Sequence, residues 1–143
     1  MPSPIDPRGP RFAATLTSVV LALVLLTAPG PVATVLLAAQ AAVFAVGAVS
    51  GVQHTPYALA FRTLVRPRLG APGELEDPRP PRFAQAVGLG FTLVGLAALL
   101  SGVTTLGLAA VGLALAAALL NAATGFCLGC EVYLLVRRII ATA

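Results

Sequence analysis

Apolar residues dominate the chain in two long stretches without a charged side chain, Phe12–Phe61 and Phe83–Cys130. The hydrocarbon core of a bilayer is about 30 Å thick and one helix crosses it with about 20 apolar residues, so each stretch is long enough for two crossings. Proline and glycine interrupt each stretch near its middle and favour tight reversals there. The pattern predicts an all-α integral membrane protein with four transmembrane helices. We expect them at about residues 12–28, 31–52, 83–100 and 103–125.

Nearly the same sequence introduces both stretches. Residues 6–13 read DPRGPRFA and residues 77–84 read DPRPPRFA, which differ at one position and lie at an offset of 71. The same offset aligns LVR at 64–66 with LVR at 135–137 without a gap. Such self-similarity is typical of a chain built from two copies of one unit.

The repeat predicts the organisation of the chain. One membrane domain covers residues 1–143 and contains repeat one over 6–69, a Pro-rich cytoplasmic linker over 70–76, and repeat two over 77–141. Each repeat holds two crossings, an even number, so both repeats enter the membrane in the same direction. We therefore expect tandem parallel two-helix repeats, related by a pseudo-twofold axis along the bilayer normal.

A short interfacial helix is expected after the second crossing of each repeat. Thr55 is a good N-cap and Pro56 a favoured first helical residue, so a helix lying along the cytoplasmic interface should begin there. At the offset of 71, Pro56 corresponds to Cys127, with Gly125 near the expected break. The repeat therefore predicts a second short helix with Cys127 at or near its first turn.

The composition agrees with a membrane location and argues against a soluble enzyme. Of 143 residues, 58% are hydrophobic and 10% charged, against about 25% charged in soluble domains, and the mean hydropathy is +0.95. The net charge of +4 does not indicate a nucleic-acid partner, because all nine basic residues are arginines that flank the crossings. The positive-inside rule places both termini and the central connection in the cytoplasm, in a multi-pass protein of the cell membrane.

The two cysteines, Cys127 and Cys130, are spaced as C-x-x-C. A helix N-terminus lowers the pKa of a thiol, and the thiolate is the nucleophile in disulfide exchange, so a break before Cys127 favours redox or sulfur chemistry. Glu131 lies one turn beyond Cys127, where it can carry protons to a thiol or pair with an arginine. Two alternatives stay open: cysteines that pack between helices, and a metal site. Two thiolates fall short of four ligands, so a metal would need His54 and Glu131 or a second subunit, and none is assigned.

Further polar residues are candidates for supporting roles. His54 lies in the matching zone of repeat one, as an auxiliary group or a hydrogen-bonded boundary residue. Gln40, Ser50 and Asn121 lie at membrane depth, where they can line a path or pair with one another, and Asn121 also fits a stripe for helix packing. The four arginines at the starts of the first and third crossings can hold an anionic ligand or anchor lipid head groups: Arg8, Arg11, Arg79 and Arg82.

Three segments resemble a known family. The DPRxPRFA opening of each half, HTPYALAFRTLVRPRL over 54–69 and GFCLGCE over 125–131 are similar to the bacterial domain of unknown function 4395, a small membrane family common in actinobacteria. The resemblance covers nearly the whole chain and implies no established activity. It implies a genomic association with thioredoxin-like proteins and rhodanese-type sulfurtransferases, which favours thiol or sulfane-sulfur chemistry at the C-x-x-C.

We therefore expect a membrane-embedded thiol-disulfide or sulfane-sulfur relay protein. In it Cys127 is the nucleophile, Cys130 the resolving thiol and Glu131 a proton shuttle, with a cytoplasmic thioredoxin-like or sulfurtransferase partner. A carrier or channel for a small sulfur anion and a non-catalytic membrane scaffold subunit are the alternatives. The sequence requires no cofactor, leaves the electron or sulfur donor unknown, and is compatible with a homo-oligomer in contact with membrane lipids.

Overall fold

The computed structural model describes residues 3–142, and these residues are helical apart from short connections and one β-bridge. The four long helices are α1 (Arg8–Thr27), α2 (Pro31–Ser50), α4 (Arg79–Leu100) and α5 (Thr104–Thr124). The shorter elements are η1 (Val52–His54), α3 (Pro56–Ala60), η2 (Phe61–Val65), η3 (Arg66–Arg68) and α6 (Leu128–Thr142). All four long helices are long and apolar enough to cross a membrane, which confirms the predicted number.

Helices α1 and α4 begin earlier than the charge pattern predicts. The carboxylate of Asp6 accepts the backbone N–H of Arg8 at 3.0 Å, and that of Asp77 accepts the N–H of Arg79 at 2.9 Å. A carboxylate that accepts a free N–H at a helix start stabilises the first turn. The arginines expected before the crossings therefore belong to the helices themselves.

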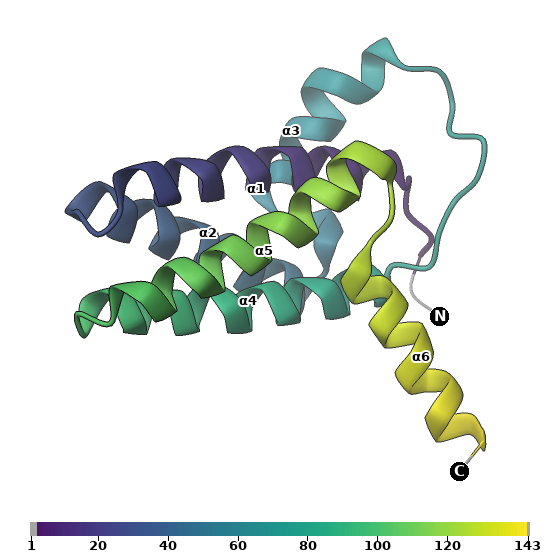
Figure 1. Ribbon diagram of the computed structural model, residues 1–143. Coiled ribbons are helices and arrows are strands. Elements are labelled where there is room, and N and C mark those ends of the chain that lie inside the picture. Colours follow the sequence, from purple (N-terminus) through teal and green to yellow (C-terminus); the bar gives the residue numbers. More distant parts are fainter. Residues whose placement is uncertain (1–2, 143) are drawn as a thin grey trace.

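The long helices form an antiparallel bundle in which α1, α2, α4 and α5 follow one another around a ring (Figure 1). Each packs mainly against its two ring neighbours, so α1 contacts α5 and α2 contacts α4 across the two halves of the chain. Large apolar side chains also cover the outside of the bundle, for example Leu26, Val35 and Val49, which are 80%, 67% and 72% exposed. Such a surface suits lipid and not water.

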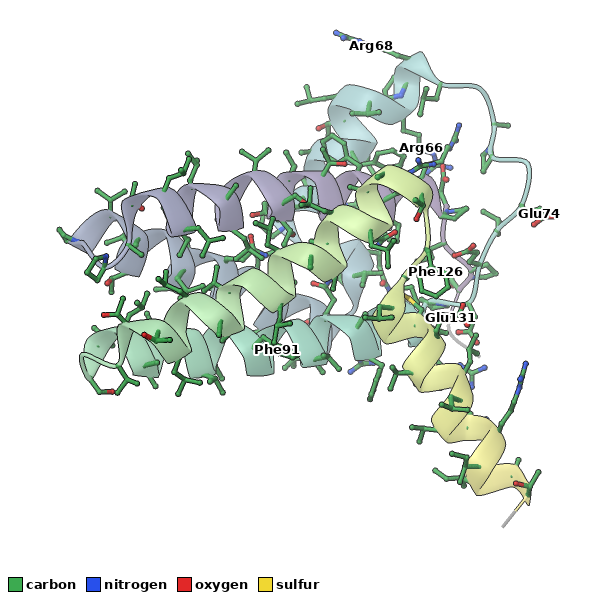
Figure 2. The ribbon with its side chains drawn as sticks, viewed as in Figure 1. Arg66, Arg68, Glu74, Phe91, Phe126 and Glu131 are labelled. Atoms are coloured by element: carbon green, nitrogen blue, oxygen red, sulfur yellow. A yellow bond between two sulfur atoms is a disulfide. The ribbon has the colours of Figure 1, made fainter. Side chains whose placement is uncertain are left out.

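The two ends of the bundle differ. The end with the α1–α2 and α4–α5 hairpins is closed by a core whose fully buried members include Leu21, Leu37 and Val111. At the other end, where both termini lie, α3 and α6 leave the bundle in opposite directions (Figure 1). Arg66, Arg68, Glu74 and Glu131 all lie at this second end (Figure 2). These charged residues thus lie at the end of the bundle where α3 and α6 diverge.

Equivalent aromatic contacts hold the two diverging segments. Phe12 of α1 packs on Phe61 with ring centroids 5.8 Å apart, and Phe83 of α4 packs on Tyr133 of α6 at 5.6 Å. Helix α3 begins at Pro56 as predicted, and the hydroxyl of its N-cap Thr55 accepts the N–H of Ala58 at 3.1 Å. Helix α6 has 15 residues and is longer than the short helix expected there.

Two arginines connect the halves. Arg11 of α1 donates to the carbonyls of residues 122 and 123 at the end of α5, at 3.0 and 2.9 Å. Arg82 of α4 donates to the carbonyls of residues 48 and 49 at the end of α2, at 2.7 and 2.6 Å. The last carbonyls of a helix have no partner within it, so each guanidinium satisfies the end of a helix from the other half.

The linker over 70–76 is tied to the start of the chain. Ile5 and Glu76 exchange two backbone hydrogen bonds of 2.8 Å, and the guanidinium of Arg8 donates to the carbonyl of Gly70 at 3.0 Å. The connection between the halves is therefore anchored near both of its ends.

Candidate functional site

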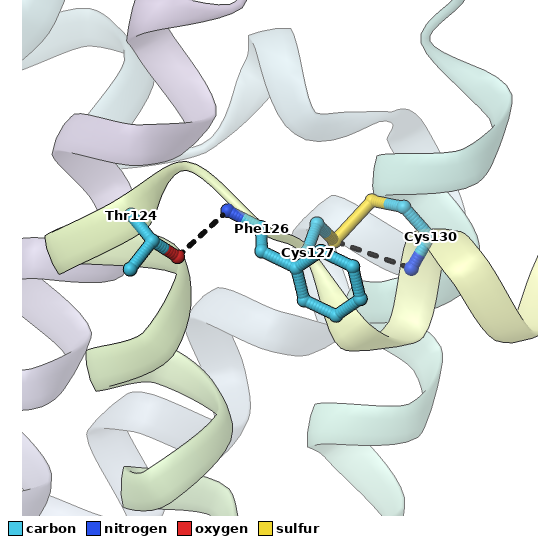
Figure 3. The surroundings of a disulfide bond; sticks show 4 residues. All are labelled: Thr124, Phe126, Cys127 and Cys130. Carbon is cyan, nitrogen blue, oxygen red and sulfur yellow. Dashed lines mark hydrogen bonds between the residues drawn. A yellow bond between two sulfur atoms is a disulfide. The ribbon is translucent and has the colours of Figure 1, made fainter.

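The candidate site begins where α5 is interrupted before α6. Gly125 ends α5 with a φ of +78°, a left-handed conformation that glycine adopts without the strain of a side chain. The hydroxyl of Thr124 accepts the N–H of Phe126 at 3.2 Å (Figure 3). The carbonyl of Cys127 then accepts the N–H of Glu131 at 3.0 Å, the first hydrogen bond of α6. The break predicted near Gly125 is present, and Cys127 immediately precedes α6.

Cys127 and Cys130 form a disulfide, with their Cα atoms 5.1 Å apart. The backbone N–H of Cys130 donates to the Sγ of Cys127 at 3.2 Å (Figure 3). Both residues are partly buried. The Sγ of Cys127 therefore lies at the N-terminus of α6, where backbone N–H groups and the helix dipole favour a thiolate over a thiol when the disulfide opens.

A cavity of about 330 Å³ lies beside the disulfide, and both cysteines line it. Its walls come from α1, α2, α4 and α5 and from the first turn of α6. Asn121 and Gln85 contribute amide groups to the wall, and Phe44 and Phe91 contribute aromatic rings. This size is at the lower end of the range of about 300 to 1,000 Å³ typical of small-molecule sites.

A second cavity of about 330 Å³ lies at the same end of the bundle, between α1 and the segment that follows α2. The two cavities share Thr17, Gln85 and Pro10 as lining residues. The second cavity has no cysteine and is lined by charged or aromatic groups that include Arg66 and Tyr57. We call the two spaces the disulfide cavity and the arginine cavity.

The predicted site residues separate into two groups. Asn121 is partly buried and lines the disulfide cavity together with Cys127 and Cys130. Glu131 is exposed and is not among the residues lining that cavity, and the salt bridges within residues 3–142 do not include it. His54 is exposed and its Nδ1 donates to the carbonyl of Ser50 at 2.6 Å, as expected for a boundary histidine. Among the described residues, no group of three or more histidine, cysteine or acidic side chains could hold a metal ion.

The four candidate arginines all have partners within the protein. Arg8 pairs with Asp6 and Arg79 with Asp77, each at 2.7 Å, and Arg11 and Arg82 bind the helix ends described above. The hydrogen bond from Arg8 lowers the pKa of Asp6. Arg8 and Arg11 also line the disulfide cavity. A role for the four in binding an anion or lipid stays a prediction.

A buried polar chain that no sequence pattern indicates connects α1, α2 and α3. Gln40 is 1% exposed; its amide donates to the hydroxyl of Thr17 at 3.3 Å, and its Oε1 accepts the hydroxyl of Tyr57 at 2.6 Å. Burial raises the pKa of Tyr57. Pairing of Gln40 with Ser50 or Asn121 was expected, and the partners are different because Gln40 faces α1 and α3. No local pattern indicates these partners, since Thr17 and Tyr57 lie on other elements.

These features define an antiparallel bundle of four membrane-type helices with a C-x-x-C disulfide at a helix N-terminus. The chain belongs to the family called domain of unknown function DUF4395, whose sequence profile matches residues 5–138. No curated protein and no solved structure matches the chain. The resemblance stated for the sequence is thus confirmed at the level of the family.

Proposed function

We propose that the protein is a membrane-embedded thiol-disulfide relay that exchanges disulfides through Cys127 and Cys130. The observation that carries this proposal is the position of the Sγ of Cys127, at the N-terminus of α6 and 3.2 Å from the N–H of Cys130. A cysteine that only packs needs no such environment, whereas a leaving or attacking thiolate is stabilised by it. The guanidinium of Arg11 adds positive charge near the start of α6. Its Nη1 would lie 3.9 Å from a Cβ built on Gly125, two residues before Cys127.

The exchange runs through a mixed disulfide on Cys127. A thiolate of a partner dithiol attacks the Sγ of Cys127, the Cys127–Cys130 bond breaks, and Cys130 leaves as a thiolate that takes up a proton. The second partner thiolate attacks the partner sulfur bound to Cys127, and Cys127 leaves as a thiolate. The partner is thereby oxidised to a disulfide and this protein is reduced to a dithiol. Glu131, one residue from Cys130, is the proposed donor of the proton.

The partner has the chemistry of a thioredoxin-like protein with a solvent-accessible dithiol. A sulfane-sulfur form of the proposal uses the same atom: the Cys127 thiolate takes a sulfur atom from a persulfide carrier and releases the carrier as a thiolate. The two forms differ in the mass of the species trapped on Cys127, which is a whole protein in one and a single sulfur atom in the other.

Trapping tests the proposal. The Cys130→Ser variant, purified in detergent with Cys127 reduced, is mixed with a thioredoxin-like protein that keeps only its attacking cysteine, held as a mixed disulfide with thionitrobenzoate. A covalent adduct on Cys127 is expected to accumulate, because thionitrobenzoate leaves and neither protein retains a resolving thiol. The Cys127→Ser variant, with Cys130 intact, is the matched control and should give none. Non-reducing gels and intact mass measure both. The proposal is wrong when neither a protein adduct nor an added sulfur atom appears on Cys127 after oxidised partner and persulfide donor are supplied.

The placement in the membrane is part of the proposal. Both repeats run in the same direction about a pseudo-twofold axis, α3 and α6 lie along the cytoplasmic interface, and both termini are cytoplasmic. The paired contacts of Arg11 and Arg82 and the amphipathic α6, which carries Arg137 and Arg138 beside exposed apolar side chains, support this arrangement. After reduction of the disulfide, labelling of Cys127 in intact cells by permeant but not by impermeant thiol reagents is the expected result.

A further inference from the structure

We infer that the disulfide cavity binds a lipid-soluble quinone, which takes the two electrons of the reduced Cys127–Cys130 pair. The inference rests on the proposed function and names its electron acceptor. It starts from the cavity itself, which has both cysteines in its wall at the end where α5 stops. A relay that oxidises one partner after another needs an acceptor that reaches these sulfur atoms, and the cavity is the space that adjoins them.

The cavity extends from the disulfide toward membrane depth. Its lining residues on α4 run from Pro81 to Phe91, about 15 Å at 1.5 Å per residue, and those on α5 run from Asn121 back to Ala114. The deep part lies between helices that are apolar enough to cross a membrane. A folded, water-soluble protein cannot enter so narrow a space, so the occupant of the deep part is a small molecule.

The walls favour entry from the lipid. Val87, Phe91 and Leu128 line the cavity and are 37%, 36% and 48% exposed. The cavity is therefore not fully enclosed, and exposed apolar side chains suited to contact with lipid belong to its wall. A molecule that enters past these side chains comes from the membrane. The acceptor is therefore a lipid-soluble molecule and not a water-soluble one.

The polar groups are those that a quinone needs. Asn121 and Gln85 bring amide N–H donors to an otherwise mainly apolar wall, and donors of this kind can bind quinone carbonyl oxygens. The rings of Phe44 and Phe91 and the small side chains of α5, including Ala118, leave flat apolar space for the ring system. Arg11 lines the same cavity and stabilises negative charge on a half-reduced or deprotonated quinol.

The step is balanced in atoms and electrons. The thiols of Cys127 and Cys130 lose two electrons and two protons and form one S–S bond. The quinone gains two electrons and two protons, and its two carbonyl groups become the hydroxyl groups of a quinol. No further oxidant enters the step, and the quinol leaves to the lipid past the same apolar side chains.

Anaerobic titration of the full chain tests the inference. The protein in lipid nanodiscs is reduced, freed of reductant and mixed with decylubiquinone, whose fully substituted ring does not form thioether adducts with thiols. We expect one quinol per dithiol by absorbance, and one disulfide per protein by thiol-alkylation mass shift. Quinol formation that is absent in the wild type, while diamide restores the disulfide, overturns the inference and leaves the proposed exchange with a partner protein intact.

Two cavity variants and one control locate the binding site. Ala118→Leu fills the disulfide cavity and should slow quinone reduction at least about tenfold, while oxidation by water-soluble diamide stays within about twofold. Ala13→Leu fills the arginine cavity, which has no cysteine, and should leave both rates unchanged. Asn121→Ala keeps the space, removes a donor, and should raise the quinone concentration needed for half-maximal rate. Rates of quinone reduction that are the same in Ala118→Leu, Asn121→Ala and Ala13→Leu contradict binding in this cavity.

Discussion

The segments that follow α2 and α5 lie at the same end of the bundle but contain different chemistry. After α2 the chain is tied to the bundle by the buried hydrogen bonds of Tyr57, Gln40 and Thr17, whereas after α5 it carries a disulfide between two residues of one turn. At the offset of 71, the members of the polar chain correspond to small or apolar residues in the second half: Thr17 to Gly88, Gln40 to Val111 and Tyr57 to Leu128. Gly88 and Leu128 both line the disulfide cavity.

The two segments differ in the polar groups that surround them. A satisfied hydrogen-bond chain rigidifies its surroundings, because each member that loses its partner is left buried and unpaired. The corresponding positions of the second half carry no polar side chain, so this constraint is absent there. Gly88 leaves room for the ring of Phe44, and Leu128 lines the cavity beside a bond that can open and close. The first half is thus the structural half, and the second half carries the proposed chemistry.

Loss of Cys127 is expected to have the largest effect, because it removes the sulfur that forms the mixed disulfide. Cys127→Ser should abolish exchange with a partner dithiol and with quinone. Pro56→Ser, at the corresponding position of the first half, should leave exchange unchanged. Stopped-flow measurement of disulfide exchange distinguishes the two variants, and exchange that survives in Cys127→Ser contradicts the assignment of the two halves.

The polar chain of the first half should matter for stability and not for exchange. Gln40→Ala leaves the hydroxyl groups of Thr17 and Tyr57 without their partner and opens a void, so we expect a loss of about 2 to 4 kcal/mol in the free energy of unfolding.

Thermal unfolding in detergent measures this loss. Thr15→Ala, which removes an exposed hydroxyl from the same helix as Thr17, is the control and should stay within about 0.5 kcal/mol of the wild type. An unchanged unfolding temperature in Gln40→Ala contradicts a structural role for the chain, as does a loss of exchange without a loss of stability.

Gly129 tests how tightly the second half holds α6. A Cβ at this position would stand 2.7 Å from the Cβ of Ala84 on α4, so Gly129→Ala forces α6 away from α4. We expect a cost of about 1 to 3 kcal/mol and a changed rate of Cys127 alkylation after reduction. Gly90→Ala on α4 meets no atom within 4 Å and should change neither quantity. Equal alkylation rates in the two variants would show that α6 does not position the thiol.

The acid dependence of stability should differ slightly between the halves. Arg8 and Arg79 lower the pKa values of Asp6 and Asp77, so each carboxylate contributes stability above its unfolded pKa of about 3.9, and this is lost as the pH falls through the folded value. The side chain of Asp6 is 8% exposed and that of Asp77 is 42%, so solvent screens the second pair more. Asp6→Asn should lower the unfolding temperature at pH 6 more than Asp77→Asn, and both effects should shrink as the pH falls below about 3.9.

Local patterns account for the helices and for the position of the two cysteines. Uncharged runs gave the four long helices, Thr55 and Pro56 gave the start of α3, and Gly125 gave the break before Cys127. The contacts of Arg11, Arg82 and Gln40 could not be predicted, because each joins elements whose relative placement depends on how the bundle closes. Helices α1 and α4 begin earlier than the sequence predicts, because Asp6 and Asp77 stabilise a first turn that contains arginines.

The crossed arginine contacts bear on how such a chain can be divided. Arg11 serves a helix end in the second half and Arg82 serves one in the first, so each half lacks a donor that only the other supplies. Separate expression of residues 1–70 and 71–143 should give two fragments that are unstable alone and that complement each other when produced together.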